Sequence, residues 1–165
     1  MGTLGLACLL VVSYLRRGRE PLVVERLEVP PARDMPRASK GICARVIDGD
    51  TIELEGGERV RLIGVNAPES VDPRRPVEHF GEKAAEFTRR MAEGKAVRLE
   101  YDHELKDQYG RTLAYVFLPN GTFLNAEIIR QGYGFAYSRF PYHYQQDFVA
   151  LEREAREQRR GLWGR

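Results

Sequence analysis

Two glycine-containing turns divide residues 41–65 into short segments in which apolar and polar residues alternate. The first turn is Asp48-Gly49-Asp50 and the second is Glu55-Gly56-Gly57-Glu58. Alternation with a period of two predicts strands, and glycine supplies the backbone freedom that tight hairpins need. Strands joined so closely leave no room for crossover helices, so a parallel α/β sheet is excluded for this region. The three predicted strands are 42–47, 51–54 and 59–65.

The rest of the chain adds two predicted strands and three predicted helices. Phe80, Ala84, Phe87 and Met91 recur at helical spacing before Gly94. Five short strands with irregular connections favour a closed or nearly closed barrel. We therefore predict an α+β, mainly β fold, a five-stranded barrel with three helices packed beside it. The remaining elements are strands 97–101 and 111–118, a helix from Asn125 as cap to Gly132, and a helix 145–160 with Phe148, Leu151 and Ala155 inward.

The first forty residues differ in character from the rest. Residues 2–15 carry no charge, and three arginines follow by position 19. A membrane span needs about 20 apolar residues, so 1–15 is predicted to be a signal peptide core or a short membrane anchor, with a plain buried helix as the alternative. Residues 16–40 contain four prolines and mixed charges, which indicates a linker. Residues 41–165 form the predicted domain, which we expect to be membrane-anchored or exported. The sequence does not decide which side of the membrane the domain faces.

Charge and cysteine content limit the function classes. Residues 16–40 hold seven Lys/Arg against four Asp/Glu, which leaves 19 against 20 in residues 41–165. Because the domain has no bulk positive charge, nucleic-acid binding would depend on local arginines. Cys8 and Cys43 do not make a disulfide framework, and Cys43 is expected to pack as a small apolar residue in a strand.

Three acidic residues are candidates for metal binding and catalysis. Asp48 and Asp50 flank a glycine, and oxygen ligands without His or Cys suit Ca²⁺ or Mg²⁺ rather than zinc. Both residues are also ordinary turn formers, so the turn-only interpretation stays open. Glu69 follows Pro68 and could accept a proton from water beside a metal, or could be a solvated loop residue.

Two arginines and their neighbours are candidates for substrate binding. Arg61 and Arg111 could present planar donor forks to phosphate oxygens and stabilise charge on a five-coordinate phosphorus. Asp107 and Arg111 could equally form a plain surface ion pair. Tyr109 and Tyr137 could stack on bases or sugars, or could be half-buried core tyrosines.

Several motifs in order resemble the staphylococcal nuclease (thermonuclease) family over nearly all of residues 41–165. The resemblance implies an OB-fold barrel with three helices, one Ca²⁺ ion, and hydrolysis of DNA and RNA at the 5′ P–O bond to leave 3′-phosphates. The matching segments are VIDGDTIEL (46–54), RVRLIGVNAPES (59–70), FGEKAAEFTRRM (80–91), DQYGRTLAYVFLPNG (107–121), LNAEIIRQG (124–132) and GLW (161–163).

The resemblance also implies roles for individual residues. Asp50 would be the principal metal carboxylate, and Glu69 the proposed general base. Arg61 and Arg111 would bind phosphate. Asn66 and the backbone carbonyl of Ala67 would also bind the metal, and Asp48 would lie just outside the metal ligands. Asp107 and Tyr109 would line the nucleotide pocket.

Asn66 departs from the family, which usually has an aspartate there. An amide oxygen can bind Ca²⁺ but supplies one negative charge less, so weaker calcium binding is expected. Gln108 also replaces a basic residue. The predicted function is a monomeric, calcium-dependent, sugar-nonspecific nuclease. The alternative is a catalytically weak or inactive module of the same fold that binds nucleic acid or protein.

Overall fold

The computed structural model describes residues 9–10, 26–27, 38–69 and 80–164 of the chain. The chain divides into two units, Met1–Asp34 and Met35–Arg165. In the first unit, β1 (Leu9–Leu10) pairs antiparallel with β2 (Arg26–Leu27). The predicted signal or anchor segment and the predicted linker otherwise lie almost entirely outside the described residues.

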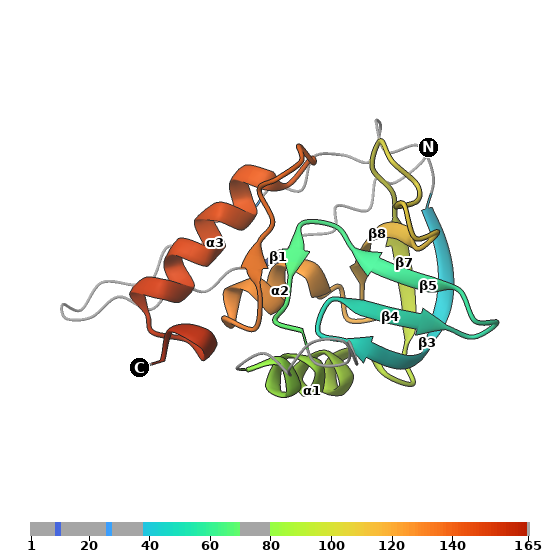
Figure 1. The fold of residues 1–165 in the computed structure, drawn as a ribbon, viewed down its shortest axis with the longest axis horizontal. Coiled ribbons are helices and arrows are strands. Elements are labelled where there is room, and N and C mark those ends of the chain that lie inside the picture. Colours follow the sequence, from blue (N-terminus) through green and yellow to red (C-terminus); the bar gives the residue numbers. More distant parts are fainter. Residues whose placement is uncertain (1–8, 11–25, 28–37, 70–79, 165) are drawn as a thin grey trace, which may run out of the picture. The chain divides into compact units, whose positions relative to one another are not determined.

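The second unit is built on a closed five-stranded barrel (Figure 1). The strands follow one another around the barrel in the order β3, β4, β5, β8, β7, and β7 pairs with β3 to close it. Only the pairing of β5 with β8 is parallel among these five. This mixed barrel with its helices is an OB-fold, as predicted. The strands are β3 (Ala38–Asp48), β4 (Thr51–Leu54), β5 (Arg59–Leu62), β7 (Ala96–Glu100) and β8 (Thr112–Phe117).

Two strands differ from the prediction by more than one residue at a boundary. β3 begins at Ala38 rather than near residue 42, because residues 38–42 pair with β7. The predicted strand 59–65 is interrupted at Gly64, whose φ of 75° lies in the left-handed region that favours glycine. The chain then forms β6 (Val65–Asn66), which pairs with β9 (Phe135–Ala136) in a separate two-stranded sheet.

Three helices accompany the barrel. α1 (Gly81–Ala92) packs against β3, and α2 (Leu124–Arg130) packs against β8 and α3 (Gln145–Glu157). Figure 1 shows α3 away from the barrel and α1 along its lower edge, with α2 between them. A 3₁₀ turn at Gly161–Trp163 ends the described chain close to α3.

Asn125 was predicted to cap the second helix, and this prediction is wrong. Phe123 occupies the N-cap position, and Asn125 lies inside α2, fully buried. Its amide donates to the carbonyls of Ile63 (2.9 Å) and Ala114 (3.2 Å) and accepts from the backbone N–H of Val116 (2.9 Å). Asn125 therefore joins α2 to the end of β5 and to β8.

Buried side chains fill the barrel and the space beneath the helices. Cys43 is a fully buried free cysteine on β3, as predicted, and burial raises the pKa of its thiol to about 11. The buried apolar face of α3 consists of the predicted Phe148, Leu151 and Ala155. None of the helices in the described residues is long and apolar enough to span a membrane.

Candidate active site

The turn that carries Asp50 is clamped between α1 and the segment after β6. A Cβ on Gly49 would lie 2.6 Å from Cβ of Ala67 and 2.9 Å from Cβ of Ala84 on α1. The buried hydroxyl of Thr88, also on α1, donates to the carbonyl of Gly49 at 2.7 Å. The turn is thus fixed from both sides, and only glycine leaves enough space for this contact.

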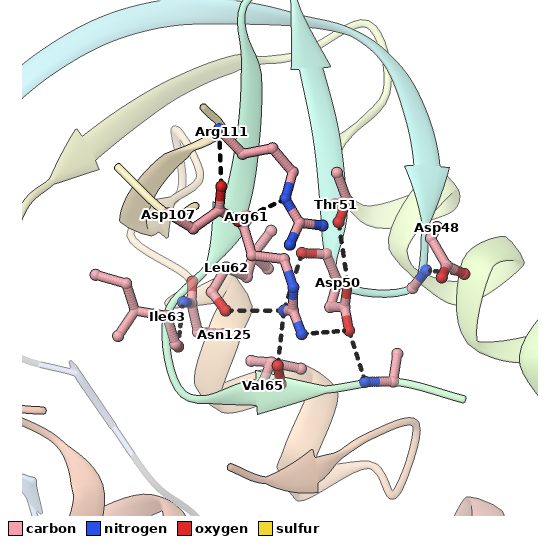
Figure 2. A network of polar contacts seen from close by, with 12 residues as sticks. Asp48, Asp50, Thr51, Arg61, Leu62, Ile63, Val65, Asp107, Arg111 and Asn125 are labelled. Atoms are coloured by element: carbon pink, nitrogen blue, oxygen red, sulfur yellow. Dashed lines mark hydrogen bonds and ion pairs between the residues drawn. The ribbon is translucent and has the colours of Figure 1, made fainter. Parts of the chain in front are cut away.

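Asp50 is buried and accepts hydrogen bonds on both carboxylate oxygens (Figure 2). Oδ2 accepts from the backbone N–H of Ala67 (2.8 Å) and pairs with Nη2 of Arg61 (3.0 Å). Oδ1 accepts from the hydroxyl of Thr51 (3.0 Å). The structure therefore brings together the two turn regions near residues 50 and 67.

Arg61 lies on β5 and is held at several points (Figure 2). Besides the ion pair with Asp50, its Nη1 faces the carbonyls of Val65 (2.7 Å), Leu62 (3.2 Å) and Asp50 (3.4 Å). These contacts orient the guanidinium group at the start of β6. They also mean that Arg61 already has acceptors in this arrangement, so a phosphate oxygen would share or exchange them.

Asp107 organises the loop that carries the other arginine. Its Oδ1 accepts from the backbone N–H groups of Tyr109 (2.9 Å) and Arg111 (3.0 Å), and its Oδ2 from Nε of Arg111 (2.7 Å). Burial would raise the pKa of Asp107, but the bonds from the Arg111 side chain and from the two backbone groups outweigh it and lower the pKa. The Asp107–Arg111 ion pair anticipated as an alternative is therefore present. Tyr109 is exposed beside Arg111, with the guanidinium carbon 5.4 Å from its ring centroid.

Strand register places Arg61 and Arg111 on the same face of the barrel. Arg61 on β5 pairs with Leu113 on β8, and Arg111 precedes Leu113 by two residues. Because side chains on a strand alternate with a period of two, Arg111 points to the same side as Arg61. In Figure 2 both guanidinium groups extend toward the turn that carries Asp50.

The other predicted metal and catalytic residues lie at the end of β6 and just after it. Asn66 is exposed, Ala67 is buried with its N–H on Asp50, and Glu69 is half-buried. A Cβ on Gly81 would lie 2.5 Å from the carbonyl oxygen of Glu69, so the start of α1 contacts the backbone of Glu69. Asp48, whose Oδ1 accepts from the N–H of Gly49 (2.8 Å), lies on the far side of the turn from Arg61 (Figure 2).

Tyr137 directly follows β9, the strand that pairs with β6. Its backbone N–H donates to the carbonyl of Gly64 (2.9 Å), one residue before β6. Its half-exposed ring lies 6.1 Å from that of Phe140, which is exposed. Tyr137 is therefore joined to the backbone just before β6, the strand that carries Asn66.

Sequence reasoning missed two buried polar residues that join distant parts of the domain. Thr88 lies within the helical pattern of α1, and nothing in its spacing distinguishes it from a neutral helix position. Asp102 comes just after the predicted strand 97–101 and carries no motif, yet its buried carboxylate accepts from the hydroxyl of Tyr115 (2.6 Å) and from the backbone N–H of His143 (2.8 Å). Burial would raise the pKa of Asp102, but these and other hydrogen bonds lower it below its ordinary value.

The predicted metal ligands suit a hard cation in kind but carry little charge. They comprise one carboxylate (Asp50), one amide (Asn66) and one backbone carbonyl (Ala67), all oxygen donors of the type that Ca²⁺ takes. No group of three or more His, Cys, Asp or Glu within the described part of the chain could hold a metal. Among the described residues, Oδ1 of Asp50 accepts one hydrogen bond, from the Thr51 hydroxyl, and a lone pair remains for a cation.

The structure thus sets two arginines beside an acidic turn on the outside of an OB-fold barrel. The chain matches the family model of staphylococcal nuclease homologues over residues 59–165, a range that includes Arg61, Asn66, Glu69 and Arg111. The chain belongs to this family. It is thereby classed with the nucleases that hydrolyse phosphodiester bonds.

Known relatives agree with this assignment. The thermonuclease of Staphylococcus hyicus is 41% identical over 123 residues, 72% of this chain and 72% of the relative. The thermonuclease of Staphylococcus intermedius is 41% identical over 133 residues, 78% of this chain and 79% of the relative. An uncharacterized protein of Methanocaldococcus jannaschii is 36% identical over 148 residues, 74% of this chain and 70% of the relative.

Proposed function

We propose that this protein is a calcium-dependent, sugar-nonspecific nuclease that cleaves DNA and RNA to products with 3′-phosphates. The observation that carries the proposal is the convergence of Asp50, Arg61 and the Ala67 backbone through contacts of 2.8 and 3.0 Å. A buried carboxylate beside an outward-facing arginine provides one place for a cation and one for a phosphate oxygen.

Each residue has a defined task in the proposed reaction. Asp50, Asn66 and the Ala67 carbonyl would hold Ca²⁺, which when bound would polarise the phosphate and orient a water molecule. Glu69 takes a proton from a water molecule, and the oxygen of this water forms a bond to phosphorus. The bond from phosphorus to the 5′ oxygen breaks, this oxygen takes a proton from solvent water and leaves as a hydroxyl group, and the phosphate stays on the 3′ oxygen.

The two arginines stabilise the charge that develops on the phosphate oxygens. Arg111 is held by Asp107 and Arg61 by Asp50, so both guanidinium groups are oriented before substrate arrives. A phosphate that binds Arg61 would compete with the carbonyls of Leu62 and Val65 for its N–H groups.

A plasmid digestion assay tests the proposal against the alternative of an inactive binding module. The wild type should cut supercoiled plasmid with Ca²⁺ and fail with EDTA, while Glu69→Gln and Arg111→Ala should each lose roughly 10²-fold or more in rate. Glu86→Gln and Arg90→Ala are matched controls, because these residues form an exposed ion pair on α1 (3.6 Å). Plasmid binding without cutting by the wild type would favour the binding module.

The chemistry of the ends tests the product. Fragments with 5′-hydroxyl groups accept label from polynucleotide kinase without prior phosphatase treatment, whereas 5′-phosphate ends do not. Parallel digests of DNA and RNA oligonucleotides of the same sequence should proceed at rates within about tenfold if the sugar is not read. Label incorporation only after phosphatase treatment would refute the proposed bond cleavage.

Residues 1–15 are proposed to direct the domain to a membrane or out of the cell, where it acts as a monomer. Fractionation of cells that express the full chain should find it in the envelope or the medium, and deletion of residues 2–15 should leave it in the cytoplasm. Light scattering of the purified protein should give the mass of one chain. A cytoplasmic full-length chain would contradict the localisation.

A further inference from the structure

Beyond the scissile-phosphate site, arginine side chains continue across the outer face of the barrel. Arg45 on β3 pairs with Glu53 on β4, which pairs with Arg59 on β5. Continuing the parallel register of β5 and β8 by one residue sets Arg111 beside Arg59. The four positions form one row that crosses four neighbouring strands. Arg61, two residues from Arg59, points to the same side.

The acidic residue of this row lies beneath its arginines. Glu53 bonds Arg45 through both carboxylate oxygens (2.8 and 3.0 Å) and Arg59 through one (3.5 Å). The side chain of Glu53 is only 16% exposed, whereas those of Arg45 and Arg59 are 57% and 59% exposed. The solvent-facing surface of the row therefore consists of guanidinium groups.

Like charges on neighbouring strands normally destabilise a sheet. Arg59 and Arg111 are adjacent in the row. Arg111 is paired with Asp107 at 2.7 Å, whereas the contact of Arg59 to Glu53 is longer, at 3.5 Å. A polyanion laid across the strands would bind these arginines together and relieve their repulsion. Neighbouring strands lie about 4.8 Å apart. Arg59 is one strand away from Arg111, and Arg45 is three strands away.

We propose that Arg59 and Arg45 form a phosphate-binding track that holds a single strand of nucleic acid beyond the scissile phosphate. This inference rests on the proposed function and extends it, because it makes a longer polynucleotide a better substrate than a dinucleotide. The ligand is the sugar–phosphate backbone, so the track is indifferent to base sequence. Planar guanidinium forks contact successive phosphates along the row.

The test compares charge variants with a matched control. R45Q/R59Q removes the track, and R45Q/E53Q/R59Q removes it without leaving Glu53 unpaired. R90Q/R156Q is the control, because Arg90 and Arg156 are 58% and 54% exposed, lie on α1 and α3, and each pairs with one glutamate. Urea denaturation of each variant verifies that it is folded.

The first readout is binding of a fluorescent 12-nucleotide single-stranded DNA in EDTA, which does not depend on cleavage. Both track variants should bind about tenfold more weakly at 0.1 M salt. The slope of log affinity against log salt should fall by about 1.4, because each phosphate contact on a single strand contributes about 0.7. An unchanged slope, or an equal loss in R90Q/R156Q, would overturn the track.

The second readout is cleavage of a dinucleotide, whose one phosphate occupies the scissile site. Its kcat/KM in the track variants should stay within about twofold of the wild type, while KM for the long strand rises. Equal loss on both substrates would mean that the row acts only through the scissile site, and would overturn the track. Failure of the wild type to cleave either substrate would instead refute the proposed function, since the binding readout is independent of it.

Discussion

Substitution of Gly49 by alanine should destabilise the protein, although most replacements of this kind do the opposite. The φ of Gly49 lies outside the left-handed region, so alanine adopts this backbone without strain. Gly→Ala at such positions ordinarily stabilises by about 0.4–1 kcal/mol, because it lowers the entropy of the unfolded chain. Here the new methyl group decides the sign of the stability change, because it would lie 2.6 Å from Cβ of Ala67 and 2.9 Å from Cβ of Ala84.

The expected magnitude follows from these contacts. Overpacking a buried site by one methyl group costs about 1–3 kcal/mol, which leaves a net loss of about 1–2 kcal/mol after the entropic gain. With a urea m-value of about 2 kcal/mol/M, the denaturation midpoint should fall by about 0.5–1 M. The clash also pushes the turn away from Ala67, whose N–H bonds Asp50. A displacement of this kind costs about 10²-fold in activity per ångström.

Urea denaturation monitored by fluorescence of Trp163, the single tryptophan, measures the first effect, and plasmid cleavage measures the second. The double variant Gly49→Ala/Ala67→Gly provides the control, because it removes the closer of the two clashing methyl groups. It should recover about 1 kcal/mol relative to the sum of the single variants. If Gly49→Ala is as stable and as active as the wild type, the turn is not clamped as described.

Four further predictions follow from single contacts. Asn66→Asp should tighten calcium binding about tenfold by calorimetry, because it adds a carboxylate to the proposed ligands, and an unchanged affinity would contradict this. Thr88→Val should lower the free energy of unfolding by about 1–3 kcal/mol, because the Gly49 carbonyl loses its donor. Thr88→Ser keeps the hydroxyl and should keep most of this stability in the same urea assay. Asp102→Asn should destabilise the protein more at pH 7 than at pH 3. The pKa of Asp102 is lowered in the folded protein. Its contribution to the free energy of unfolding is therefore complete above the unfolded pKa of about 3.9 and disappears as the pH falls through the lower folded pKa. Equal differences in urea midpoint between variant and wild type at both pH values would refute this. In a Cys8→Ser background, Cys43 should react with a thiol reagent at pH 8 at least about 100-fold faster in urea than when folded, since burial keeps its thiol protonated.

Local patterns predicted the strands and helices well, because their causes are local. The turns at Gly49 and Gly56-Gly57 set the antiparallel order β3, β4, β5 directly. The parallel pairing of β5 with β8 has no such signal, because α1 and β7 separate these strands in the chain. The requirement for glycine at position 64 is partly non-local, because a Cβ there would lie 2.5 Å from the Tyr142 ring, which is distant in sequence.

The site was predictable as a set of residue types but not as a set of contacts. Asn125 illustrates the limit, because asparagine near a predicted helix start favours capping. The folded chain instead uses both ends of its amide to join three backbone groups from β8 and the end of β5. Thr88 is similar, since its hydroxyl could bond its own helix or, as observed, the Gly49 carbonyl.

The pairing of β6 with β9 sets the order in which a growing chain can complete this centre. In the part of the chain that the structure describes, Val65 and Asn66 pair with Ala136 and Phe135, and the Gly64 carbonyl accepts from the N–H of Tyr137. Ribosomes release a chain from its amino end, so the barrel can close while this edge still has no neighbour. A nascent polypeptide halted before residue 135 would therefore carry every proposed catalytic side chain and still lack the scaffold that orders the loop at Asn66.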